Sequence, residues 1–136
     1  QAEQAVLKVI QKKYPKAFKV NGNFKEYDLE IPEIKKTIEI KWDKGSEQTG
    51  NYFIETGFNG KDSGIDATQA DWWCIVDKST ILFIPTESLQ YVLKKHYCFN
   101  RDLKGADGTT VRYKLLRKDI LQGYGYATLL PRVATS

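Results

Sequence analysis

The chain has 136 residues, a length typical of a single domain with its own hydrophobic core, so residues 1–136 are expected to form one domain. Hydrophobic residues make up 41% and charged residues 28%, and the formal net charge of +4 permits a polyanionic partner without requiring one. Because no apolar run approaches the roughly 20 residues of a membrane span and no signal-peptide pattern is present, the sequence predicts a soluble, cytoplasmic protein. The chain has no Met and begins at Gln1, which is consistent with upstream residues having been removed.

Cysteine and histidine are scarce, which excludes several classes of site. The two cysteines, Cys74 and Cys98, form no disulfide framework and no Cys-x-x-Cys pair, as in proteins of a reducing compartment. Zinc sites built on several histidines cannot be assembled from His96 alone. His96 shares helical spacing with the apolar residues before it and comes at a predicted helix end, so we interpret it as structural.

The first half of the chain is predicted to contain one helix and several strands. In chain order, the elements are a helix at 2–14, a short strand at 18–20, a turn at 21–23, strands near 24–31 and 36–43, a polar loop at 44–50 and a strand at 51–58.

The second half contains the most apolar segment, residues 72–76, which is typical of a central strand buried on both faces. The predicted elements are a loop at 59–64, a short helical turn at 65–70, strands at 72–77 and 80–85, a helix from 86 to about 97, a loop at 100–110, a strand at 111–116, at most a short helix at 118–122, and an edge strand at 127–130. Together these elements predict an α/β fold with a central mixed β-sheet of five or six strands flanked by helices.

Two strictly alternating segments, residues 27–31 and 37–42, are the most informative part of the sequence. Residues 32–35 between them form a connecting turn. A hairpin centred between residues 33 and 34 sets Leu29 opposite Ile38, with both apolar side chains on one face.

The same register sets Asp28 opposite Glu39, with Lys41 on the same face. Two directly opposed carboxylates repel each other, and a divalent cation between them would make the arrangement favourable. Mg²⁺ takes oxygen ligands, often one or two carboxylates together with water and phosphate. Lys41, about 7 Å further along the strand, could orient a water or stabilise developing charge. The alternative is a solvated strand face on which Glu26 pairs with Lys41.

Asp28, followed after a hairpin-length gap by Glu39-Ile40-Lys41, resembles the motif of the PD-(D/E)xK nuclease superfamily. Three downstream stretches strengthen the resemblance, which is closest to small phage-type endonucleases and Holliday-junction-resolvase-like members. These stretches are Asn51-Tyr-Phe-Ile-Glu55, Ser63-Gly64-Ile65 and Thr68-Gln69-Ala70-Asp71-Trp72-Trp73. The resemblance covers residues 28–73, and one departure is Tyr27, which stands where the motif has proline.

The resemblance implies a restriction-endonuclease-like core: a helix, three antiparallel strands, a helix and a strand. It also implies a metal-dependent, virus-encoded hydrolase that cuts phosphodiester bonds in DNA, with branched or double-stranded DNA as its partner. Mg²⁺ or Mn²⁺ would be held by Asp28, Glu39 and the carbonyl of Ile40, and Lys41 would be the catalytic lysine.

Further residues are candidates for the same site, each with a structural alternative. Additional metal or water ligands are expected among Glu3, Glu55 and Gln69. Glu3 could instead favour the first turn of its helix, and Glu55 could pair with a lysine. Candidate DNA contacts are Ser63, Thr68, Lys35 and Lys36, which are otherwise turn, cap and surface residues.

The sequence is also compatible with two other functions. The chain could be a catalytically inactive nucleic-acid-binding or assembly module on the same fold, or a nuclease that acts on RNA. A homodimer is expected by analogy, because cutting two strands calls for two sites.

Overall fold

The structure is a computed structural model that describes residues 2–22 and 26–130. Its helices are α1 (Ala2–Gln11), α2 (Ser46–Thr49), α3 (Thr86–Lys95) and α4 (Lys118–Gln122), with 3₁₀ turns η1 (Pro32–Ile34) and η2 (Gly64–Asp66). Its strands are β1 (Phe18–Lys19), β2 (Leu29–Ile31), β3 (Lys36–Trp42), β4 (Asn51–Phe58), β5 (Lys61–Asp62), β6 (Trp72–Val76), β7 (Thr80–Pro85), β8 (Phe99–Lys104), β9 (Thr110–Arg117) and β10 (Tyr126–Leu129). Within the described ranges, no helix is long and apolar enough to cross a membrane.

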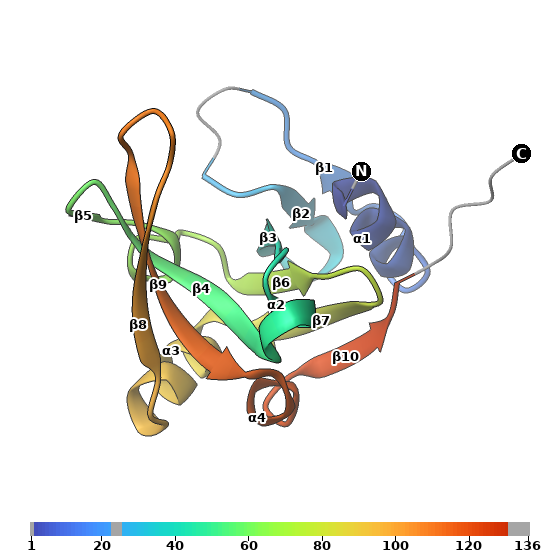
Figure 1. The fold of residues 1–136 in the computed structure, drawn as a ribbon. Helices are drawn as coiled ribbons and strands as arrows, with labels where there is room; N and C mark the ends of the chain where they lie inside the picture. Colours follow the sequence, from blue (N-terminus) through green and yellow to red (C-terminus); the bar gives the residue numbers. More distant parts are fainter. Residues whose placement is uncertain (1, 23–25, 131–136) are drawn as a thin grey trace, which may run out of the picture.

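The strands form two sheets (Figure 1). Sheet A has the order β1-β2-β3-β6-β7-β10 and is mixed, because β3 and β6 run parallel while its other pairs are antiparallel. Sheet B has the order β5-β4-β9-β8 and is entirely antiparallel. The prediction of an α/β fold with a mixed sheet flanked by helices is therefore confirmed, and the second sheet was not anticipated.

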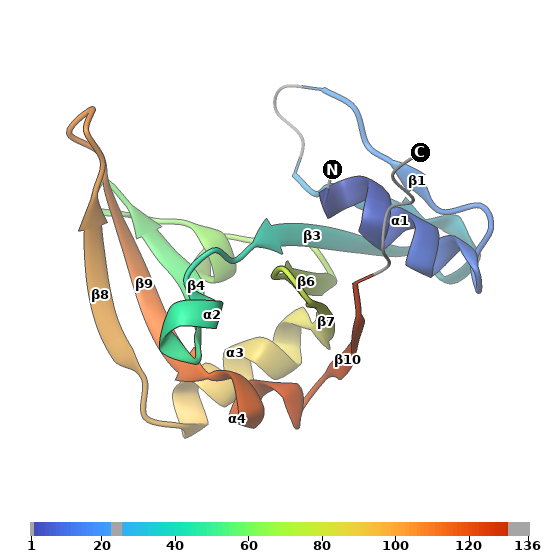
Figure 2. The same ribbon diagram turned by 45° about the vertical axis from the view of Figure 1, so that its right-hand side comes forward.

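Two hydrophobic clusters hold these layers together, one on each face of sheet A. The first cluster packs α1 against sheet A through residues that include Val6, Ile10 and Cys74. The second packs the other face against sheet B, α3 and α4, and Trp73 and Ile75 of β6 belong to it. Figure 2 shows α1 and α3 on opposite sides of this sheet. Both faces of β6 are thus buried, as its continuous apolar sequence predicted.

The predicted hairpin register is confirmed. Leu29 lies opposite Ile38, and the two neighbouring pairs follow the same register around η1. Leu29 is fully buried and Ile38 is 2% exposed, so the apolar face of the hairpin joins the core under α1. A slip by one residue would turn these side chains to the other face, which is why their alternation fixes the register.

Three features differ from the sequence-based predictions. β4 pairs with β5 and β9 instead of β3, so the three consecutive antiparallel strands implied by the resemblance are not formed around β3. Residues 99–104, predicted mostly as loop, form β8, whose six residues are all exposed and give little hydrophobic signal. The polar segment 44–50 contains the short helix α2. The predicted turn at 21–23 and the start of the strand near 24 fall partly on residues 23–25, which lie outside the described residues.

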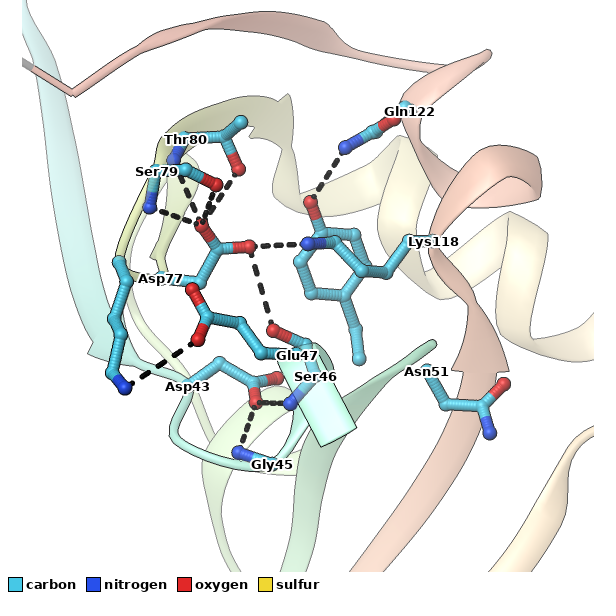
Figure 3. Close-up of polar contacts among 12 residues, drawn as sticks. Asp43, Gly45, Ser46, Glu47, Asn51, Asp77, Ser79, Thr80, Lys118 and Gln122 are labelled. Atoms are coloured by element: carbon cyan, nitrogen blue, oxygen red, sulfur yellow. Dashed lines mark hydrogen bonds and ion pairs between the residues drawn. The ribbon is translucent and has the colours of Figure 1, made fainter. Parts of the chain in front are cut away.

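Sheet A and sheet B are joined by buried carboxylates (Figure 3). Asp43 follows β3 and Asp77 follows β6, and the backbone N–H of Asp43 donates to the carbonyl of Val76. One oxygen of Asp43 accepts the N–H groups of Gly45 and Ser46, which begin α2. The other accepts the N–H of Phe53 in β4 at 2.8 Å, so one side chain positions both α2 and the first residues of sheet B.

Asp77 is fully buried and makes the ion pair of this network. Its Oδ1 accepts hydrogen bonds from the backbone and hydroxyl groups of Ser79 and Thr80. Its Oδ2 lies 2.5 Å from Nζ of Lys118, the first residue of α4. Burial alone would raise the pKa of Asp77, but these hydrogen bonds, above all the one from Lys118, lower it to about 2.

We predict that Lys118→Met lowers the free energy of unfolding by about 3 kcal/mol at pH 7, because it leaves the buried Asp77 carboxylate without its cation. The lowered pKa of Asp77 stabilises the folded state above pH 4, and this contribution is lost as the pH falls from about 4 to about 2. The difference in the free energy of unfolding between Lys118→Met and the wild type should therefore decrease as the pH falls from about 4 to about 2. Urea unfolding of both proteins at several pH values measures this difference.

Lys78→Met is the matched control, because the Lys78–Glu47 ion pair is exposed. Its effect should stay below about 0.5 kcal/mol. Equal destabilisation by both substitutions would contradict the special role of the buried pair.

Candidate functional site

The hairpin of β2 and β3 brings Asp28 beside the middle of β3. The backbone N–H of Asp28 donates to the carbonyl of Ile38 at 2.9 Å, one residue out of the Leu29–Ile38 register, so the regular pairing ends at Leu29. The N–H of Ile40 donates to Oδ2 of Asp28 at 2.7 Å. Since the N–H and C=O of one strand residue point to the same side, the Ile40 carbonyl is directed toward the edge of β3 where Asp28 lies.

Glu39 lies between a carboxylate and a cation. Its carboxyl group shares a hydrogen bond with Asp28, and Nζ of Lys41 lies 3.6 Å from its Oε2. Burial of Glu39 and the negative charge of Asp28 raise its pKa from 4.5 to about 7, against an opposing effect of Lys41. Asp28 and Glu39 thus lie close enough to interact, with Lys41 next to Glu39.

The ammonium group of Lys41 lies over an aromatic ring. Its Nζ lies 5.5 Å from the ring centroid of Trp73, which pairs with Glu39 across β3 and β6. Trp73 is 1% exposed, and its Nε1 donates to Oγ1 of Thr68 at 3.2 Å. The indole therefore makes a cation–π contact with the ammonium group, and the hydrogen bond to Thr68 holds the indole in place.

Glu39 and Lys41 open into a cavity of about 320 Å³. Its wall combines β3 with the connection from β5 to β6 and includes the predicted Ser63, Thr68 and Gln69. The full lining is Glu26, Glu39, Lys41, Asp62, Ser63, Gly64, Ala67, Thr68, Gln69 and Trp73. Asp62 was not anticipated, although it directly precedes the Ser-Gly-Ile stretch. Hydroxyl, amide, carboxylate and ammonium groups thus converge on one concave surface.

The Ser63-Gly64-Ile65 stretch fixes this wall against β4. Oγ of Ser63 donates to Oε2 of Glu55 at 2.8 Å. Gly64 has a φ of +54°, and a Cβ there would lie 2.1 Å from the carbonyl oxygen of Glu55, so only glycine fits. Ile65 is 1% exposed in the core. Glu55 is therefore bonded to Ser63 beside the cavity, and it does not belong to the cavity lining.

The remaining candidates lie elsewhere. Glu3 forms an ion pair with Lys19 at 3.0 Å on α1 and β1, and is outside the described lining of the cavity. Lys35 ends η1 in a left-handed conformation, and Lys36 begins β3 on the face opposite Glu39. Neither Lys35 nor Lys36 lines the cavity, so the structure does not place these two predicted DNA contacts at the candidate site.

Comparisons with protein-family models, with curated proteins and with solved structures return no match to the chain. Among the described residues, no group of three or more His, Cys, Asp or Glu side chains is placed to hold a metal ion. The candidate site offers two carboxylates, those of Asp28 and Glu39, beside a backbone carbonyl.

We predict that Glu39→Gln changes the pH dependence of stability in the presence of EDTA. Because the folded-state pKa of Glu39 is raised from 4.5 to about 7, its protonated form is favoured in the folded protein. The resulting stabilisation is present below pH 4.5 and is lost as the pH rises to about 7. The variant should match the wild type near pH 4.5 and exceed it above pH 7. Thermal unfolding across this range provides the measurement, and parallel curves for both proteins would refute the coupling.

Proposed function

We propose that the chain is a divalent-metal-dependent endonuclease that hydrolyses phosphodiester bonds in DNA. The observation that carries this proposal is the close approach of Asp28 to Glu39, beside Lys41, with Glu39 and Lys41 lining a polar cavity. A solvated strand face does not account for the burial of Asp28, which is 7% exposed, or for the raised pKa of Glu39.

The donor set suits Mg²⁺ or Mn²⁺. Asp28, Glu39 and the Ile40 carbonyl would supply hard oxygen ligands, and water and a substrate phosphate complete such sites in other proteins. A dication would also reverse the sign of the Asp28–Glu39 interaction, because both carboxylates would then face a positive charge. When bound, the metal would neutralise phosphate charge and increase the acidity of a bound water.

The protein groups orient the reaction. Lys41 places a positive charge above the indole of Trp73, where it can orient the attacking water and stabilise the charge that develops on the phosphate oxygens. The water oxygen forms the new bond to phosphorus as the bond to the leaving oxygen breaks in line with it. Gln69 and the hydroxyl groups of Ser63 and Thr68, all in the cavity wall, can hold the remaining phosphate oxygens.

A restriction-endonuclease-like core is part of the same proposal. We assign α1, the β2–β3 hairpin and β6 to this core, since β6 runs parallel to β3 and carries the ring under Lys41. The displacement of β4 into sheet B is the main departure. The motif strand Asn51–Phe58 then has a different task, which is to carry Glu55 and the cavity wall.

The test compares cleavage of plasmid and branched DNA, with Mg²⁺ or Mn²⁺, by the wild type and by Glu39→Ala and Lys41→Ala. Each substitution removes a metal ligand or a charge-stabilising group, so each should lower the rate by about 10²-fold or more. Glu47→Ala and Lys44→Ala are matched controls, because they remove the same charges from exposed positions. They should cut like the wild type.

Each other result has a definite meaning. Cleavage that survives both Glu39→Ala and Lys41→Ala would refute the assigned roles. Salt-sensitive DNA binding without any metal-dependent cleavage would favour an inactive nucleic-acid-binding module instead. An RNA substrate tested side by side distinguishes a ribonuclease.

A further inference from the structure

Sheet B presents an unusual face to solvent. Its inner face packs into the core through Tyr52 and Ile54 of β4 and Leu116 of β9, together with α3 and α4. Residues paired across antiparallel strands point to the same side, so the register also identifies the residues of the other face. We call this other side the outer face, and its rows are Lys61-Phe58-Val111-Leu103, Glu55-Tyr113-Arg101 and Phe53-Leu115-Phe99.

The outer face is aromatic and aliphatic where a solvated sheet face is normally polar. Phe99 is 59% exposed, and Phe58 and Leu103 are each 43% exposed. Asn100 and Asp102 of β8 point to the opposite side, where they line a separate polar cavity. The alternation of β8 thus places its apolar side chains outward, which indicates that a partner covers them.

The charges on the outer face favour a polyanionic partner. Lys61 and Arg101 are exposed at the two edges of the aromatic rows. The carboxylate of Glu55 is half-buried and accepts the Ser63 hydroxyl. A second copy of the chain would bring two sets of these cations into one interface, which disfavours self-association through this face.

The outer face also leads into the proposed active site. Lys61 and Asp62 form β5, and Asp62, Ser63 and Gly64 line the cavity next to Glu39 and Lys41. Figure 1 shows the β4–β5 connection and the β8–β9 hairpin side by side at one end of sheet B. A strand lying across the outer face can therefore continue to the cavity.

We propose that the outer face of sheet B binds an unpaired segment of DNA. Its bases stack on Phe58, Phe99 and Tyr113, while Lys61 and Arg101 hold the adjoining phosphates. Stacking needs bases that are free of a complementary strand, and every base offers a flat face to an aromatic ring. The inference rests on the proposed function in that DNA is the substrate, and it specifies a substrate with a single-stranded portion.

The experiment measures fluorescence anisotropy of labelled oligothymidylate of about 15 nucleotides, a length suited to a stacking surface of this kind. EDTA is present, so binding is separated from cleavage. Phe58→Ala and Phe99→Ala should each weaken binding about tenfold, as expected for the loss of one stacked base. Neither side chain is fully buried, so both variants are expected to fold, and unchanged thermal unfolding confirms that the fold is intact.

Tyr91→Ala is the matched control, because Tyr91 is an aromatic residue 55% exposed on α3 and outside sheet B. It should bind oligothymidylate within about twofold of the wild type. A fully paired duplex of the same length should be bound less tightly and be insensitive to Phe99→Ala.

Three results would overturn the inference: unchanged oligothymidylate binding in Phe58→Ala and Phe99→Ala, an equal loss of binding in Tyr91→Ala, or a dimer in sedimentation that Phe99→Ala dissociates without changing DNA binding.

The experiments distinguish failure of this inference from failure of the proposed nuclease function. Cleavage of plasmid DNA with no effect of the sheet B variants refutes the stacking surface alone. Oligothymidylate binding through Phe58 and Phe99 without cleavage refutes the nuclease activity alone.

Discussion

The geometry of the molecule depends on the buried carboxylate of Asp77. It ends β6, bonds the turn into β7, and reaches Lys118 at the start of α4. β4 and β9 make up the centre of sheet B, and each is tied to this region, β4 through Asp43 and β9 through Lys118. β4 carries the connection that walls the candidate site, so these buried charges, which directly follow β3 and β6, help to place that wall relative to β3.

The candidate site differs from the Asp77 network, because it places two carboxylates close together. In the Asp77 network, the cation and the hydrogen bonds satisfy every oxygen, and the lowered pKa keeps the group ionised. At Asp28 and Glu39 two carboxylates share one environment, and the pKa of Glu39 rises instead. A structural network gains stability from its charges at neutral pH, whereas this pair loses it. A cost of this kind, beside an open polar cavity, is the observation on which the proposal of a cation site rests.

The sequence was informative wherever burial enforced alternation. The β2–β3 register followed from Leu29 and Ile38, because a slip would expose both. The register ends at this pair, and Asp28 approaches Glu39 from the segment before β2. β8 was missed because all of its residues are exposed, so no buried face marked it. The Asp77–Lys118 pair joins residues 41 positions apart, and no local pattern encodes such a contact. A carboxylate after each of two strands, Asp43 and Asp77, was the available signal, but it required knowing that those strands run parallel.

In the proposed nuclease, the two sheets would have different tasks. Sheet A carries the charged groups on β3, whose positions must hold to a fraction of an ångström, and it buries both faces around them. Sheet B leaves Phe58, Phe99 and Leu103 of its outer face exposed, and the proposed stacking surface would accept any base, because stacking imposes no sequence. The connection through Asp62 and Ser63 belongs to both, since it ends β5 and walls the cavity. In this proposal, substitutions on the outer face of sheet B would change the affinity for DNA, and substitutions on β3 would change the positioning of the phosphate that is cut. Gly64 packs the connection between the two regions against β4.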